Sequence, residues 1–197
     1  MAVSRKHLYK IMDKNLESYV RVYTDVFSHD FCKQAVEELK NSNFEIHRFY
    51  DPKKNSYQSF DKELSVSNYK ISREVELYEG VWNSLQNYVY DFKFPWFAGW
   101  NGFLEIRFNQ YKINTQMAEH CDHIHSMFDG QKKGIPILSI VGVLNDDYEG
   151  GEFIMWQDTK IELITGDVLI FPSNFLYPHR VNEVTKGTRN TFVSWAW

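Results

Sequence analysis

The chain has few of the residues that define several common protein classes. It contains only two cysteines in 197 residues, Cys32 and Cys121. This scarcity argues against a disulfide framework or a thiolate zinc site, and it fits a reducing compartment, so we expect a cytoplasmic protein. Positive charge is not in excess either, because 22 Lys and Arg residues are outnumbered by 26 Asp and Glu residues and the formal net charge is −4. That balance argues against nucleic acid or an anionic membrane as a partner.

Long apolar segments are also lacking. No run approaches the roughly 20 apolar residues needed to span a bilayer. Residues 1–18 are charged and lack the apolar centre of a secretory signal. The sequence therefore predicts neither a membrane span nor a signal peptide. No repeat, low-complexity segment or linker divides the chain, so we expect one domain over residues 1–197.

Aromatic side chains, in contrast, are abundant at 17% of the residues.

The first half of the chain predicts helices and irregular segments. Ser28 is placed to cap a helix over residues 29–41 whose apolar positions fall on one face. Ser72 is placed to cap a second helix, in which an apolar stripe at helical spacing ends shortly before Pro95. Between the two helices, residues 51–68 are polar and predict a loop or a flap that covers a site.

From Phe103 onward the apolar period changes from about 3.6 to 2. Apolar and polar residues alternate over residues 104–111, which predicts a strand with one face on a core and the other facing a cavity. Turn sequences separate further predicted strands at residues 117–123, 137–145, 152–156, 160–164, 167–171, 179–183 and 189–197. We therefore expect an α+β protein with an all-β core over residues 101–197. That core would be a jelly roll (a double-stranded β-helix), and residues 1–100 would form a helical and irregular buttress.

Three residues in this β-rich half form a candidate ligand set. His120 and Asp122 form a His-x-Asp pair, and on a strand residues i and i+2 point to the same side. His179 lies far along the chain and must reach the pair from another strand. Two imidazoles and one carboxylate are the protein ligands of the facial triad in non-haem Fe(II) oxygenases, which leaves the other metal positions open. The pattern therefore predicts that these three side chains bind a metal.

Arg189 adds a fixed cation to this set. It opens the last predicted strand, and a hairpin turn at residues 185–187 would place that strand next to the one that carries His179. A guanidinium at this place could bind the far carboxylate of a 2-oxo acid that chelates the metal. The expected site thus combines a metal with an acidic co-substrate.

Each part of this pattern is weak when taken alone. A His-x-Asp pair arises by chance roughly 0.4 times in a chain of this composition. A lone His179 is more often a packed histidine than a ligand, and a lone Arg189 is more often a solvated charge. The combination is stronger, because the residues come in the expected order, lie in β-rich sequence and end with a basic residue at short range. We therefore favour a metal site over a structural role.

These residues resemble the 2-oxoglutarate/Fe(II)-dependent dioxygenases, and most closely their prolyl 4-hydroxylase-like branch, over about residues 104–197. Tyr111 stands nine residues before His120, as in that family. Three further segments are similar to the family pattern: Leu144-Asn145 running to Gly150-Gly151-Glu152, Gly166-Asp167 running to Pro172, and His179-Arg180-Val181 running to Gly187-Thr188-Arg189. The family often has Gly at the position of Asn114, and some members have Lys at the position of Arg189.

The resemblance implies Fe(II) bound by His120, Asp122 and His179. It also implies 2-oxoglutarate and O2 as co-substrates, with ascorbate as an optional reductant. Arg189 and Tyr111 would bind the 5-carboxylate of 2-oxoglutarate. The implied reaction is hydroxylation of a C–H bond, in a protein side chain or a small molecule, with release of succinate and CO2.

Neighbouring residues extend the expected site. Arg107 and Asn109 share the strand face of Tyr111. We expect Asn109 to contact 2-oxoglutarate and Arg107 to contact the substrate, with a structural hydrogen-bond network as the alternative. Trp195 shares the strand face of Arg189 and is a further candidate for substrate contact, with ordinary packing as the alternative.

Two other classes of function stay open at this point. A cupin-type metal jelly roll that does not use 2-oxoglutarate is the first, although cupins usually supply more histidine ligands and need no counterpart of Arg189. A degenerate binding module with the same fold is the second. His123 and His125 are expected to be surface or supporting groups rather than ligands. The sequence contains no signal for the identity of the substrate or for the oligomeric state.

Overall fold

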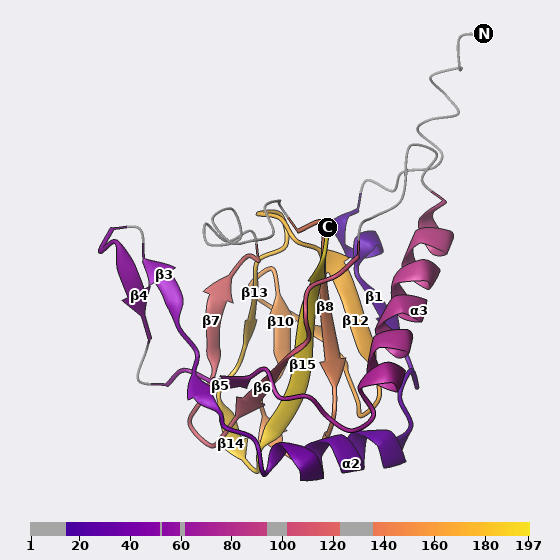
Figure 1. The fold of residues 1–197 in the computed structure, drawn as a ribbon. Helices are drawn as coiled ribbons and strands as arrows, with labels where there is room; N and C mark the ends of the chain where they lie inside the picture. The colour runs from indigo at the N-terminus through magenta and orange to yellow at the C-terminus, as the bar shows by residue number, and fades with distance from the viewer. Residues whose placement is uncertain (1–14, 52, 60–61, 94–101, 123–135) are drawn as a thin grey trace, which may run out of the picture.

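The computed structural model describes residues 15–51, 53–59, 62–93, 102–122 and 136–197, which form two facing β-sheets with helices against the larger one (Figure 1). In spatial order, the larger sheet contains β1 (Arg21–Tyr23), β12 (Val168–Pro172), β8 (Leu138–Val143), β15 (Arg189–Ala196), β6 (Arg107–Tyr111), β5 (Ser65–Ser67) and β2 (Glu45–Ile46). The smaller sheet contains β11 (Thr159–Ile161), β10 (Phe153–Met155), β13 (His179–Val181) and β7 (Met117–His120). Neighbouring strands pair antiparallel in both sheets.

Two short strand pairs and three helical segments complete the described elements. β3 (Phe49–Asp51) pairs with β4 (Ser56–Gln58), and β9 (Glu149–Gly150) pairs with β14 (Val184–Lys186). The helical segments are the 3-10 helix η1 (Leu16–Tyr19) and the α-helices α2 (His29–Leu39) and α3 (Glu74–Phe92). The expected all-β core with a helical buttress is therefore confirmed, as a jelly roll whose sheets stay open rather than closing into a barrel.

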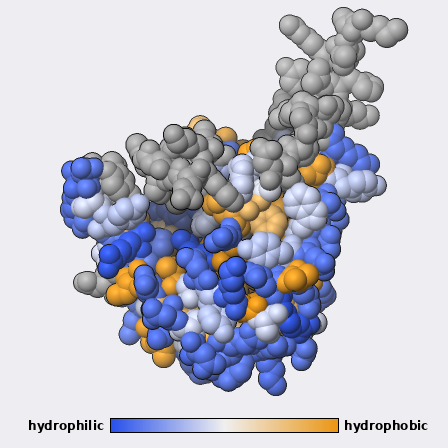
Figure 2. All heavy atoms as spheres, viewed as in Figure 1, coloured by the Kyte–Doolittle hydropathy of each residue, from blue (hydrophilic) through white to orange (hydrophobic). Residues whose placement is uncertain are grey.

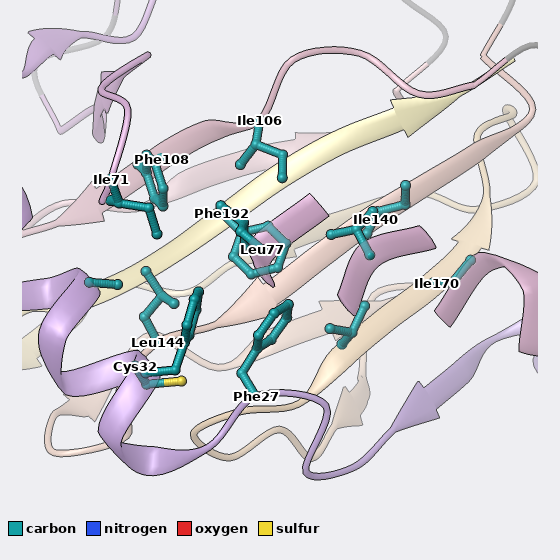
Figure 3. Packing of buried hydrophobic residues seen from close by; sticks show 14 of the residues in the cluster. Phe27, Cys32, Ile71, Leu77, Ile106, Phe108, Ile140, Leu144, Ile170 and Phe192 are labelled. Carbon is teal, nitrogen blue, oxygen red and sulfur yellow. The ribbon is translucent and has the colours of Figure 1, made fainter. Parts of the chain in front are cut away.

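The two helices cover the outer face of the larger sheet. Figure 1 shows α3 along one side of this sheet and α2 across its lower end. Apolar side chains of both helices pack with Phe108, Ile140 and Phe192 of the sheet, as Figure 3 shows. These side chains are almost completely buried, and burial of apolar surface from water is the main force that fixes the helices on the sheet.

A second apolar cluster lies between the two sheets. Val141 and Val193 of the larger sheet contribute to it, and Phe153 and Val181 of the smaller sheet do so from the other side. β8 therefore has its two faces in two different cores, and every one of its residues is buried. This explains why its sequence is a nearly continuous apolar run rather than an alternation of apolar and polar residues.

The first half of the chain contributes strands as well as helices. β1 pairs with β12 at one edge of the larger sheet, while β5 pairs with β6 and β2 with β5 at the other. The prediction of a loop over residues 51–68 is therefore wrong in part, because β4 and β5 fall within that segment. Its role as a flap stays a prediction, as does the division of a single domain near residue 100.

The two helix starts differ in how well the sequence predicted them. The Ser28 hydroxyl accepts a hydrogen bond from the Phe31 N–H at 3.1 Å, so the expected cap of α2 is confirmed. The expected cap of α3 is wrong, because that helix begins after Arg73 without a side-chain cap. The Ser72 hydroxyl instead donates to the Glu38 carboxylate at 2.5 Å, which ties the start of α3 to the end of α2. The Ser72 hydroxyl therefore binds a carboxylate of α2 and does not cap α3.

Figure 2 shows a mainly hydrophilic face with scattered hydrophobic spots. None of the helices that the structure describes is long and apolar enough to cross a membrane.

Gly166 fixes the entry of α2. Its φ angle is +92°, and a Cβ at this position would lie 2.2 Å from the Phe27 carbonyl oxygen. The Gly166 carbonyl accepts from the Phe27 N–H at 3.1 Å, while the Gly166 N–H donates to the Val143 carbonyl at 2.9 Å. A residue with a side chain would have to displace this backbone contact. The Gly-Asp segment before β12 therefore has a structural reason for its glycine.

We expect Gly166→Ala to lower the free energy of unfolding by about 2 kcal/mol more than Gly102→Ala does. Gly102 is the matched control, because its φ is also positive, at +133°, but a Cβ there meets no atom within 4 Å. Urea denaturation of both variants measures the difference. Equal losses would mean that the contact with Phe27 does not constrain the fold.

Candidate metal centre and its pocket

The three expected ligands converge at one end of the smaller sheet. His120 is the last residue of β7 and His179 is the first residue of β13, and the two are directly paired across these strands. Asp122 follows β7 by two residues, so the predicted strand over 117–123 ends earlier than expected. One ligand atom from each side chain lies within 4.8 Å of the other two. The Asp122 Oδ1 is 3.3 Å from the His120 Nε2 and 3.7 Å from the His179 Nε2.

Both histidines are oriented by backbone carbonyl groups. The His120 Nδ1 lies 2.8 Å from the Ala118 carbonyl oxygen, and the His179 Nδ1 lies 3.1 Å from the Tyr177 carbonyl oxygen. A carbonyl can only accept, so each Nδ1 carries a proton, which leaves each Nε2 as the nitrogen that can bind a metal. This is the tautomer that a metal ligand needs.

The protonation states suit a metal centre. Burial lowers the pKa of His179 to about 4, which keeps this imidazole neutral at ordinary pH. Burial by itself also lowers the pKa of His120, but a hydrogen bond with Asp122 and its charge raise it overall. Burial raises the pKa of the Asp122 carboxyl, but the neighbouring imidazoles and Ser139 outweigh burial and hold it well below its usual range. The set therefore offers one carboxylate and two imidazole nitrogens.

Ser139 holds the second oxygen of Asp122, and a second buried serine, Ser173, contacts Ser139. The Ser139 hydroxyl donates to the Asp122 Oδ2 at 2.5 Å, and the Ser173 hydroxyl lies 2.6 Å from that of Ser139. Oδ2 is thus engaged while Oδ1 faces the imidazoles. The sequence analysis missed both serines. Ser139 could have been noticed as a lone polar residue within the apolar run of β8, whereas no sequence signal marks Ser173.

Arg189 is buried in the same pocket and is only 1% exposed. Its Nε donates to the Tyr148 hydroxyl at 3.2 Å, and its guanidinium carbon lies 5.0 Å from the centroid of the Tyr111 ring. It forms no ion pair with any residue in the described parts of the chain. A guanidinium that is buried without a carboxylate partner is costly, so this geometry suits an anionic ligand. Tyr148 is a contact that the sequence analysis missed.

The prediction that the strand of Arg189 lies next to the strand of His179 is wrong. β15, which carries Arg189, does not lie next to β13, which carries His179, because β15 pairs with β6 and β8 in the opposite sheet. The residues 185–187 belong instead to the end of β14, which pairs with β9, and the following turn. Arg189 and His179 therefore meet across the space between the two sheets and not along one sheet.

Gly151 makes room for this arginine. Its φ angle is +66°, and a Cβ there would lie 3.1 Å from the Arg189 Cδ and 3.2 Å from the Tyr148 ring. The Gly-Gly pair in the sequence thus corresponds to a close approach of the backbone to Arg189. Asn114 stands where the family often has Gly, and it adopts the left-handed conformation with φ +66°. Asn is among the residues that tolerate this conformation best.

The pocket has an empty volume of about 440 Å³ and is lined by both sheets. Tyr111, Asn109 and Arg107 face it from β6, as the alternation of that strand predicts, and Thr191 and Trp195 face it from β15. Burial raises the pKa of Tyr111, so its phenol is a hydrogen-bond donor. All the expected contact residues therefore line one pocket with the metal triad. His123 and His125 lie outside the described residues.

The family comparison agrees with this geometry. Residues 106–197 match the family model of the 2OG-Fe(II) oxygenase superfamily. A PKHD-type hydroxylase of Idiomarina loihiensis is 34% identical over 94 residues, which is 46% of this chain and 40% of that protein. A PKHD-type hydroxylase of Delftia acidovorans is 35% identical over 103 residues, which is 48% of this chain and 42% of that protein. The chain thus spans about two fifths of the length of these curated relatives.

Solved structures with a similar fold extend over nearly the whole chain. A prolyl-4-hydroxylase of Pseudomonas putida superposes with a TM-score of 0.62 at 17% identity, over 90% of this chain and 91% of that one. A prolyl hydroxylase of Trichoplax adhaerens, solved with a peptide fragment of a hypoxia inducible factor, superposes with a TM-score of 0.67 at 14% identity, over 100% of this chain and 94% of that one. At these identities the likeness is one of fold.

The family name implies Fe(II), 2-oxoglutarate and O2, and the donor set fits such a metal, since two imidazole nitrogens and one carboxylate oxygen converge. The comparisons favour an oxygenase over the cupin-type alternative. Residues 106–197 therefore match the 2OG-Fe(II) oxygenase superfamily, and the fold of the chain is similar to that of the prolyl hydroxylases.

Proposed function

We propose that this protein is a 2-oxoglutarate-dependent hydroxylase in which His120, Asp122 and His179 hold Fe(II). The observation that carries the proposal is the meeting of two groups in one pocket. Three ligand atoms converge within 4.8 Å, and a buried guanidinium without an acidic partner among the described residues lies on the opposite sheet. When bound, Fe(II) with 2-oxoglutarate and O2 supplies the oxidising power to hydroxylate a C–H bond, with release of succinate and CO2.

The side chains of the site have distinct tasks in this proposal. His120 and His179 offer Nε2 as the metal-binding nitrogen because their Nδ1 protons are donated to carbonyl groups. Asp122 presents Oδ1 because Ser139 occupies Oδ2. Each ligand is therefore held in its binding orientation before the metal arrives, which reduces the free energy lost on ordering.

Arg189 and Tyr111 would bind the 5-carboxylate of 2-oxoglutarate. The guanidinium provides charge-assisted donors, and the phenol provides a neutral donor beside it. Asn109 of β6 and Thr191 of β15 are directly paired and line the middle of the pocket. From there they could contact the co-substrate. The apolar side chains Val141 and Phe153 line the same pocket and keep water away from it.

The substrate is proposed at the level of its class, a peptidyl side chain or a small molecule. The peptide fragment in the Trichoplax adhaerens complex supports the first option for a protein of the same fold. We keep a cytoplasmic location as part of the proposal, since Cys32 and Cys121 are both free thiols.

We expect His179→Ala to lower the turnover of 2-oxoglutarate to succinate, measured without added substrate, by at least about 100-fold. The loss follows because two remaining ligands hold the metal poorly. His29→Ala is the matched control, since His29 is exposed at the start of α2. Full turnover in His179→Ala would show that this histidine is not a ligand.

Arg189→Met should weaken 2-oxoglutarate binding by about 100-fold while leaving the affinity for Mn(II), used in place of Fe(II), within about threefold. Methionine keeps much of the side-chain volume and removes the charge. Anaerobic titration followed by tryptophan fluorescence measures both affinities. Arg21→Met is the control, because Arg21 lies on β1 over the Phe92 ring and outside the pocket. An unchanged affinity for 2-oxoglutarate would remove Arg189 from the proposed site.

Ser139→Ala should weaken Mn(II) binding by roughly 10- to 100-fold, because the Asp122 carboxylate loses the donor that fixes its orientation. Ser194→Ala is the matched control, since Ser194 is a fully buried serine of the same sheet that donates to the Leu104 carbonyl instead. Thermal unfolding of the two metal-free variants separates a loss of stability from a loss of affinity. If both variants bound the metal as wild type does, orientation by Ser139 would be excluded.

A further inference from the structure

Arg107 is a second cation in the pocket that no described side chain neutralises. Its Nε donates to the Asn109 amide oxygen at 3.2 Å, and its guanidinium carbon lies 5.2 Å from the centroid of the Trp195 ring. It forms no ion pair with any residue in the described ranges, and no hydrogen bond there engages its terminal nitrogens. Burial lowers the pKa of Arg107, although the side chain keeps partial exposure to solvent.

Two carboxylates, Asp122 and Glu63, interact electrostatically with Arg107, but both have other partners. Asp122 is held by the imidazoles and by Ser139. Glu63 is buried, and its Oε1 lies 3.3 Å from the His47 Nδ1. Neither comes within ion-pair distance of Arg107. No described side chain therefore occupies the terminal donors of the guanidinium.

The position of Arg107 separates it from the proposed 2-oxoglutarate contacts. On β6 it is four residues from Tyr111, or about 13 Å along the strand. Tyr111 is paired with Arg189, whereas Arg107 is paired with Val193. In the proposed complex the charges of Fe(II), 2-oxoglutarate, Asp122 and Arg189 cancel. Arg107 then remains as the one uncompensated positive charge among the described residues that line the pocket.

A donor without an acceptor lies beside Arg107. The Trp195 Nε1 is buried and has no hydrogen-bond partner in the described structure. An indole N–H can only donate, so this atom needs an acceptor. The Thr191 hydroxyl, on the same face of β15, is likewise buried without a partner among the described residues. The planar fork of Arg107 can pair with both oxygens of a carboxylate, and the indole N–H of the neighbouring Trp195 is a further donor.

We infer that Arg107 and Trp195 bind a carboxylate of the substrate, at the end of the pocket away from Arg189. This inference rests on the proposed function, because it assigns the primary substrate of the same site. The substrate is then an acid, either a free small carboxylic acid or a peptide that presents a carboxylate near the C–H bond to be hydroxylated.

The test compares carboxylic acids with their amides as ligands of the protein saturated with Mn(II) and 2-oxoglutarate under anaerobic conditions. The probes are N-acetyl-L-proline and N-acetyl-L-alanine with their amides, and the peptide Ala-Pro-Ala as free acid and as amide. We expect at least one acid to bind with a Kd at least about tenfold lower than that of its amide. A preference confined to the acetyl amino acids indicates a small substrate, and a preference that includes the peptide indicates a peptidyl one.

Two variants assign the preference to the proposed residues. Arg107→Gln should abolish the difference between acid and amide while leaving the Kd for 2-oxoglutarate within about threefold of wild type. Trp195→Phe keeps the stacked ring, loses the N–H, and should reduce the preference by about threefold or more. Arg21→Gln is the control and should retain the full preference.

The outcomes that would overturn the inference are distinct. If no acid binds better than its amide, the pocket has no site for a substrate carboxylate. If Arg107→Gln weakens 2-oxoglutarate binding as strongly as Arg189→Met, Arg107 belongs to the co-substrate site instead. If the wild-type protein binds neither Mn(II) nor 2-oxoglutarate, the proposed function itself has failed, and the inference falls with it.

Discussion

The cost of burying a guanidinium without a carboxylate beside it shapes the whole pocket. Arg189 is 1% exposed, and its side chain contacts the Tyr148 hydroxyl, the Tyr111 ring and Gly151 without an ion pair to any described residue. A protein can tolerate this only if the rest of the fold is stable enough to hold the charge in place or if an anion arrives to neutralise it. The pairing of β15 with both β6 and β8, in the middle of the larger sheet, provides that rigidity.

The site depends on two sheets that face each other. The proposed metal ligands belong to the smaller sheet or to the segment that follows β7, while Arg189, Tyr111 and Arg107 belong to the larger one. Ser139, also on the larger sheet, reaches across to Asp122. Facing sheets lie about 10 Å apart, which is a distance that a small diacid and a metal can bridge. The apolar cluster between the sheets therefore sets the dimensions of the site as well as the stability of the fold.

The sequence predicted the β-rich core and the residues that converge at the proposed site because each leaves a local mark. Examples are the i, i+2 spacing of His120 and Asp122 and the alternation that places Arg107 and Tyr111 on one face. It did not predict which strands are neighbours, because pairing between distant strands depends on the whole topology. Arg189 was accordingly expected beside His179 and is found in the opposite sheet. Ser173 and Tyr148 were missed since their roles come from contacts with residues far away in the chain.

The family match begins at residue 106, yet the structure does not begin there. Without the preceding residues, β6 would lose its neighbour β5 and β12 would lose its neighbour β1. Both strands would then be exposed sheet edges with unpaired backbone groups. The outer face around Phe108, Ile140 and Phe192 would also lose the helices that cover it. A fragment cut at the family boundary would therefore be prone to aggregate, although it would carry every proposed metal ligand.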